Sequence, residues 1–196
     1  MLRRVSLFQR EWFLFQIEKE AVNIVTLFAF MKNDINFREI LTDTEEYVGD
    51  LKRFPGIITP DCSLYIDAPL LVQIAGIYLN RAVGYFLSKQ GIYTVPNIRW
   101  GDERTYTDEV FGEKVAFQGV DKHSIVSIGT YGQIQSAESK RYFREGLIAM
   151  LDELEPEVVL VYGSMPNKIF GDLMERTGFV RFDDWTTKVK NPQKLK

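Results

Sequence analysis

Short apolar runs alternate along the chain with longer stretches in which apolar residues recur every three or four positions. The runs have the length of buried strands, and they predict strands at 25–30, 56–59, 94–98, 124–129, 158–163 and 179–182. Neighbouring parallel strands need a connection long enough to hold a helix, so this alternation is typical of an α/β fold. We expect a mostly parallel sheet of about six strands with flanking helices, either three-layered or an incomplete barrel, because a closed barrel typically takes about 250 residues.

Capping residues, glycines and prolines divide the chain between these strands, and they predict helices over 67–91, 136–156 and 169–178. Asp67 is a candidate cap for the first helix and Gly91 ends it. Ser136 is the candidate cap of the second helix, and Pro156 terminates it. Pro96 lies inside a predicted strand and cannot donate to a ladder, so we expect that strand to be an edge strand, bulged or distorted.

The length of 196 residues indicates one domain with short extensions. We expect an N-terminal helical segment over 1–22, a single α/β domain over 23–187 and a basic tail over 188–196. The basic residues at the two ends are either solvated termini or local patches for a partner.

Composition and charge narrow the class of protein. Hydrophobic residues make up 45% of the chain and charged residues 26%, which is ordinary globular usage and argues against long disorder. The net charge of −3 gives no global positive field for nucleic acid or an anionic membrane. Cys62 is the single cysteine, so we expect no disulfide framework and a reducing compartment. Charges interrupt the apolar start before a signal-peptide core forms, and no run reaches the ~20 residues of a membrane span.

Polar, small and charged side chains follow the predicted strands at the point where each strand ends. In open α/β sheets, ligands bind outside the carboxyl ends of the strands, so we expect these residues to line a shared cleft. The candidate catalytic residues and metal ligands are the acids Asp61, Asp102 and Glu103. The candidate ligand-binding residues are Asn97, Arg99, Trp100, Gly101, Thr130, Gly132, Tyr162, Gly163 and Ser164.

These residue types suit two kinds of chemistry. The acids could act as general acid and base, or as oxygen ligands of Mg²⁺ or Mn²⁺. Arg99 and the loop amides of 129–136 could hold a phosphate. The structural alternatives are that Asp102 caps a short helix, that Glu103 complements its dipole, and that 129–136 is an ordinary turn.

Other reactive residues fall away from this predicted cleft. His123 comes immediately before its strand and therefore lies at the opposite end of the sheet. Cys62 has no histidine near it in sequence, and we interpret it as a packed thiol. Arg81 lies about 21 Å along the first helix from Asp67, and we expect a structural arginine on the far side.

Several stretches together resemble the domain of unknown function 4417 family, which is carried by bacteriophages and integrative elements. The stretches are TPDCSLY, NRAVGYFL, PNIRWGDE, SIGTYG and VYGSMP, and the resemblance covers roughly residues 23–180. The family brings no established activity. The resemblance implies a mobile-element protein in a bacterial cytoplasm.

Two classes of function fit these features. The first is an enzyme or binding protein that processes or holds a phosphate-containing ligand, either a nucleotide or nucleic acid, in the strand-end cleft. The second is a non-catalytic effector, such as an anti-defence inhibitor or a replication accessory protein, which binds a host protein or nucleic acid. We favour the first, because a purely surface-binding protein has no need to collect ionisable groups at the strand ends.

Overall fold

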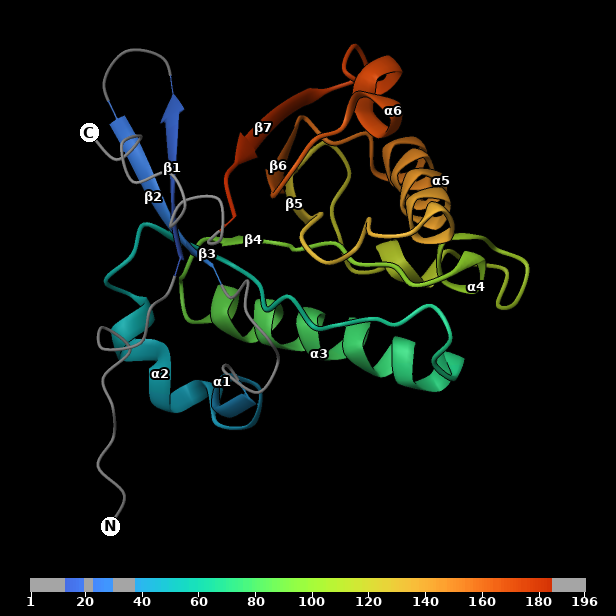
Figure 1. Ribbon diagram of the computed structural model, residues 1–196. Coiled ribbons are helices and arrows are strands. Elements are labelled where there is room, and N and C mark those ends of the chain that lie inside the picture. The colour runs from blue at the N-terminus through green and yellow to red at the C-terminus, as the bar shows by residue number, and fades with distance from the viewer. Residues whose placement is uncertain (1–12, 20–22, 30–37, 185–196) are drawn as a thin grey trace.

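The computed structural model describes residues 13–19, 23–29 and 38–184 (Figure 1). Within this part of the chain, seven strands form one sheet of four and one of three. The strands are β1 (Phe13–Lys19), β2 (Asn23–Ala29), β3 (Gly56–Ile58), β4 (Thr94–Val95), β5 (Ile125–Gly129), β6 (Val158–Tyr162) and β7 (Gly178–Phe182). The α-helices are α1 (Arg38–Thr42), α2 (Thr44–Leu51), α3 (Leu70–Lys89), α4 (Glu103–Tyr106), α5 (Ala137–Leu154) and α6 (Asn167–Phe170). Two 3-10 helices, η3 (Val115–Phe117) and η4 (Gly171–Leu173), complete the described elements.

The strands follow one another across the sheets in sequence order. β1 pairs antiparallel with β2, and the pairs β2–β3, β3–β4, β5–β6 and β6–β7 are parallel. A single parallel bridge between Asn97 and Ser127 joins the two sheets. There the Ile98 amide donates to the Ser127 carbonyl at 2.7 Å, and the Ser127 amide donates to the Pro96 carbonyl at 2.9 Å.

This architecture confirms the mixed α/β class with parallel strands. Each of the six predicted strands is present, but they do not form one six-stranded sheet, because the strand containing Pro96 is regular for two residues only. The described strands do not close into a barrel. The predicted helical segment over 1–22 is wrong where the structure describes it, since residues 13–19 form β1 and the antiparallel partner β2 supplies their hydrogen bonds.

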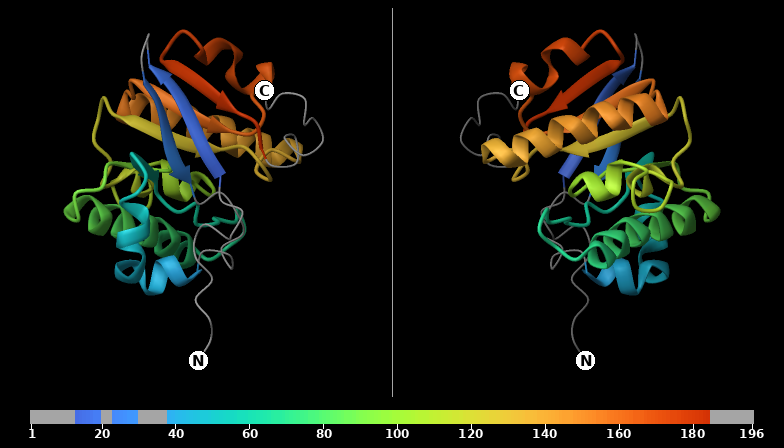
Figure 2. Two further views of the ribbon diagram at one scale, coloured as in Figure 1. Left: turned by 90° about the vertical axis from the view of Figure 1, so that its left-hand side faces the viewer. Right: turned by 90° about the vertical axis from the view of Figure 1, so that its right-hand side faces the viewer.

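Two helices cover the strands from different sides. Figure 1 shows α3 running beneath β4, while α5 lies beyond β5, β6 and β7. Both faces of β6 are buried. On one face, Val159 and Val161 pack in the cluster that contains the α5 residue Leu147. Leu160 and Tyr162, on the opposite face, pack in a separate cluster. In Figure 2, α5 crosses behind the strands of the second sheet in the left view and in front of them in the right view.

One of the two predicted helix caps is present in the structure and the other is not. Ser136 caps α5 in a capping box with Ser139, as the sequence predicts. The N-cap of α3 is Pro69, so the prediction that Asp67 caps this helix is wrong. The third predicted helix is shorter than expected, because α6 passes directly into η4.

Candidate functional site

A buried polar cluster forms just beyond the carboxyl end of β3. Asp61 is 8% exposed. Arg99 donates two hydrogen bonds to its carboxylate, from Nε to Oδ1 at 2.5 Å and from Nη2 to Oδ2 at 2.7 Å. Asn97 Nδ2 donates to the same Oδ1 at 2.6 Å. A Cβ added at Gly129 would lie 3.5 Å from Asp61 Oδ2, so the cluster reaches the end of β5. The structure therefore brings together three of the predicted site residues.

The same network continues into α3 through Arg81. Its guanidinium donates from Nη1 to the Asn80 side-chain oxygen and to the Asn97 carbonyl at 3.3 Å. It also donates from Nε to the Gln118 carbonyl at 3.0 Å and from Nη2 to the Ala116 carbonyl at 2.8 Å. All four acceptors are uncharged, and within the described residues no carboxylate pairs with this cation. Arg81 therefore carries a charge that the surrounding protein solvates but does not neutralise.

Burial has a definite effect on this guanidinium. Desolvation lowers the pKa of Arg81 from 12.5 to about 10, against a smaller opposing effect of Cys62. The group still carries its positive charge at neutral pH. The cluster contains two guanidinium groups, those of Arg81 and Arg99, but only one carboxylate, Asp61, which pairs with Arg99, so its net charge is positive.

Three side-chain atoms in or beside the cluster are buried without a hydrogen-bond partner. They are Asn97 Oδ1, Arg99 Nη1 and Ser127 Oγ. Ser127 lies next to Asn97 across the bridge that joins the two sheets. Buried donors and acceptors without partners are uncommon, and this junction contains three such atoms that form no hydrogen bond with the described residues.

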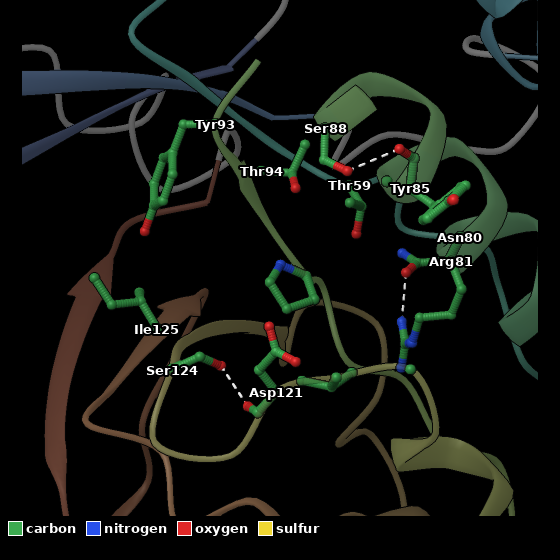
Figure 3. A pocket seen from close by; sticks show the side chains of 14 residues that line it. Thr59, Asn80, Arg81, Tyr85, Ser88, Tyr93, Thr94, Asp121, Ser124 and Ile125 are labelled. Carbon is green, nitrogen blue, oxygen red and sulfur yellow. Dashed lines mark hydrogen bonds between the residues drawn. The ribbon is translucent and has the colours of Figure 1, made fainter. Parts of the chain in front are cut away.

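A cavity of about 430 Å³ opens beside Arg81 (Figure 3). It lies between α3, the loop that follows η3, and the first residues of β4 and β5. Figure 3 shows Arg81 along one wall and Asp121 across from it. The lining residues are Thr59, Asn80, Arg81, Gly84, Tyr85, Ser88, Tyr93, Thr94, Pro96, Gly119, Val120, Asp121, Ser124 and Ile125.

This cavity is not where the sequence predicts the cleft. Its walls include Thr94 and Ile125, which begin β4 and β5, together with Thr59 and Pro96, which follow β3 and β4, so it lies alongside these strands and not beyond their carboxyl ends. None of the predicted catalytic or ligand-binding residues lines it. The polar cluster around Asp61 connects with it through Asn97 and Arg81.

Asp102 lies in a separate set of contacts. It is the N-cap of α4 and accepts from the Arg104 amide at 3.2 Å. Arg104 also donates from Nε and Nη2, each at 2.7 Å, and Gln73 Nε2 donates at 2.9 Å. Burial alone would raise the pKa of Asp102, but the hydrogen bonds from Arg104 and Gln73 outweigh it and hold the pKa below its usual value. Glu103 is exposed in the first turn of α4. Asp102 thus caps a short helix and Glu103 lies in its first turn, which is the structural alternative to a catalytic role for these two residues.

Trp100 and Gly101 have packing positions. Trp100 is 5% exposed, and its ring centroid lies 5.2 Å from that of Phe143 on α5. A Cβ on Gly101 would lie 1.9 Å from Gln73 Oε1, so this glycine permits close approach of the chain to α3.

The remaining predicted residues gather where β5 and β6 end. Thr130 Oγ1 donates to the Ser164 carbonyl at 2.8 Å. Gly163 has a φ of +113°, and a Cβ there would meet Thr130 Oγ1 at 2.5 Å. Tyr162 is buried, and Gly132 has a φ of +78° in the turn after β5. Thr130, Gly163 and Ser164 are therefore in contact just beyond the carboxyl ends of β5 and β6, and Gly132 lies in the turn that follows β5.

Metal binding by the predicted acids has no further support in the geometry. Among the residues that the structure describes, no group of three or more His, Cys, Asp or Glu side chains is placed to hold a metal ion. Asp61 and Asp102 each form a two-donor ion pair with an arginine. The assignment of Asp61, Asp102 and Glu103 as catalytic residues or Mg²⁺ or Mn²⁺ ligands stays a prediction.

Sequence reasoning missed the position of Arg81. The expectation of a far-side arginine is wrong, because the segment from β3 to α3 runs back along the helix and brings residue 60 beside residue 80. Asn80 Nδ2 donates to the Pro60 carbonyl at 2.6 Å. The available signal was the helical spacing of Gln73, Asn80 and the apolar Ile77, which marks a buried polar side of α3 next to Arg81.

Comparison with known proteins relates this chain to phage proteins. Over 169 residues it is 26% identical to the Gene 1 protein of Mycobacterium phage L5, which covers 84% of this chain and 71% of that protein. Over 136 residues it is 26% identical to the Gene 1 protein of Mycobacterium phage D29, which covers 69% of this chain and 48% of that protein. No solved structure matches the chain. The model of the family described as domain of unknown function (DUF4417) matches residues 11–183, and the chain belongs to this phage-associated family.

Proposed function

We propose that this phage-associated domain binds a phosphate-containing ligand of the nucleotide class in the cavity beside Arg81. The observation that carries the proposal is the partly buried Arg81 guanidinium, which has four uncharged acceptors and no carboxylate partner among the described residues. A partly desolvated cation without a counter-ion is unfavourable, and an anion brought into the adjoining cavity would offset that cost.

The hydrogen-bonding capacity of Arg81 agrees with an anionic ligand. A guanidinium has five N–H groups, and the four bonds to protein leave one hydrogen on Nη2 for a ligand oxygen. Arginine is suited to phosphate because its donors are fixed in a plane and its charge persists when buried. The contact would therefore combine one hydrogen bond with the attraction of an otherwise unneutralised charge.

The rest of the cavity suits the organic part of a nucleotide. Its volume of about 430 Å³ lies within the range of small-molecule sites, roughly 300–1,000 Å³. The hydroxyl groups of Ser88, Thr94 and Ser124 can bond to a sugar. Tyr85 and Tyr93, 67% and 55% exposed, offer aromatic faces on which a base can stack.

The charges in the cavity fix an orientation for such a ligand. Asp121 is the one carboxylate among the residues that line it, and Figure 3 places it across from Arg81. A phosphate would be attracted to Arg81 and repelled by Asp121. The phosphate would accordingly lie beside Arg81, with the base and sugar toward Tyr93 and the start of β5.

A matched pair of serine variants tests this location. Ser124→Phe fills the cavity from the start of β5, whereas Ser164→Phe places the same ring at the carboxyl end of β6. We expect millimolar ATP or AMP to raise the melting temperature of the parent and of Ser164→Phe but not of Ser124→Phe. Circular dichroism checks that both variants are folded.

The opposite pattern contradicts the proposal. If Ser124→Phe keeps the shift and Ser164→Phe loses it, the ligand binds at the strand-end residues instead. If no nucleotide shifts the parent, the nucleotide assignment fails. As a further check on the orientation of the ligand, Asp121→Asn should tighten binding of ATP measured by calorimetry, and weaker binding would show that Asp121 contacts the ligand favourably instead of repelling its phosphate.

A further inference from the structure

The outer side of α3 is apolar although it faces solvent. Leu71, Tyr78 and Tyr85 are 78%, 68% and 67% exposed, and Ala75 is also exposed between them. By length and composition alone α3 would pass as a membrane span, a test that core helices of soluble proteins also pass, yet only 33% of its apolar window is buried. Large apolar surfaces of this kind mark interaction sites.

The spacing of these residues is that of a helix-pairing seam. Leu71, Ala75, Tyr78, Ala82 and Tyr85 are separated alternately by four and three positions. This is a repeat of 3.5 residues, which keeps one line of side chains facing a partner helix. Large and small side chains alternate along the seam, so large ones from one helix can fit over small ones of another.

We propose that this face of α3 is the interface of a symmetric antiparallel dimer formed with a second copy of the chain. The seam is nearly symmetric about Tyr78. In an antiparallel pair centred there, Leu71 faces Tyr85 of the other copy and Ala75 faces Ala82, which lets the helices approach closely. A two-fold interface requires this kind of self-complementary patch.

Charges at the ends of α3 favour the antiparallel arrangement. Lys89 closes the helix, and the exposed Asp67 lies just before its start. An antiparallel pair brings Lys89 of one copy toward Asp67 of the other, whereas a parallel pair would bring the two lysines together. Like charges facing each other across an interface weaken association.

The area of the face is sufficient for a specific dimer. A fully covered tyrosine buries roughly 150–250 Å², so the exposed part of this face offers on the order of 500 Å² per copy. A pair would bury about 1,000 Å² in total, the lower limit for a specific interface. A membrane surface fits less well, because helices that lie on membranes carry lysine and arginine along their polar side, and α3 has Arg81 and Lys89 only.

Association of the full chain tests the proposal. Light scattering after size-exclusion chromatography should give a mass near twice the 22.7 kDa of one chain at micromolar concentration. Ala75→Glu and Tyr78→Glu place a charge in the seam and should weaken dimerisation at least tenfold. Phe111→Glu, at an apolar position that is 53% exposed but outside α3, is the matched control and should leave the mass unchanged.

Cysteine variants test the antiparallel register. Tyr78→Cys should form an intermolecular disulfide under mild oxidation, because the two copies of this position face each other. Leu71→Cys alone should not, but a mixture of Leu71→Cys and Tyr85→Cys should. A monomeric parent, a Leu71→Cys protein that crosslinks with itself, or a parent that stays monomeric and sediments with phosphatidylglycerol vesicles would each overturn the proposal. These results are independent of nucleotide binding.

Discussion

At the scale of single residues, Asp102 and Glu103 are neighbours with different surroundings. Asp102 is 4% exposed and holds α4, Arg104 and Gln73 together, while Glu103 points to solvent. The sequence alone suggests a carboxylate crowded by other acids. The structure instead surrounds Asp102 with donors, which lower its pKa where crowding would raise it.

Asp102→Ala should destabilise the protein by about 2–4 kcal/mol, because it removes a helix cap and the buried carboxylate that accepts hydrogen bonds from Arg104 and Gln73. Glu103→Ala is the matched control and should change stability by no more than about 0.5 kcal/mol. Urea unfolding at pH 7 measures both. Equal effects of the two substitutions would show that the contacts of Asp102 contribute nothing.

The effect of Asp102→Ala on stability should depend on pH, because the pKa of Asp102 is lowered in the folded protein. A carboxylate whose pKa is lower in the folded state stabilises the protein above its unfolded pKa of about 3.9. That contribution is lost as the pH falls through the folded value. The difference between the parent and Asp102→Ala should therefore shrink as urea midpoints are followed from pH 5 toward pH 3.

At the scale of elements, two helical glycines have opposite surroundings. A Cβ on Gly49 in α2 would meet nothing within 4 Å, whereas a Cβ on Gly146 in α5 would lie 2.3 Å from Trp100 Nε1. Gly146 thus sets how closely α5 approaches the segment that carries Trp100, and through it the position of the neighbouring Arg99. Gly49 has no comparable packing role.

Alanine at these two glycines should have effects of opposite sign. Gly49→Ala should stabilise the protein by about 0.4–1 kcal/mol, because alanine restricts the unfolded chain and favours helix. Gly146→Ala should destabilise it, because the indole must move in a packed core. Thermal unfolding of both variants measures this, and a Gly146→Ala protein as stable as the parent would contradict the packing described.

Most individual strands could be predicted from the sequence, but how the strands and helices pack together could not. The runs that became β3, β5 and β6 are short and apolar with polar ends, a local pattern that is sufficient for a strand. The run at Phe13–Lys19 alternates less clearly and pairs with β2, a contact that local periodicity does not show. Asp61, Asn97 and Arg99 could be grouped because strand ends meet at one edge. Arg81 could not, because its position depends on how the chain between β3 and α3 folds back.

At the scale of the whole molecule, α3 separates two surfaces. Its inner side carries Asn80 and Arg81 toward the polar cluster and the cavity, while Leu71 and Tyr78 face outward. Tyr85 lies where these two sides meet, since it lines the cavity and is also part of the seam. A second copy on the outer side would therefore lie near the mouth of the proposed ligand site.

The location of the ligand site is tested most directly by an amide NMR titration of the full chain with ATP. We expect the largest shifts on Gly84, Ser88 and Gly119, which line the cavity beside Arg81. Shifts confined to Gly132 and Gly163 would place the ligand at the strand ends, and an unchanged spectrum at millimolar ATP would show that no such ligand is bound. Either result would contradict the proposed function.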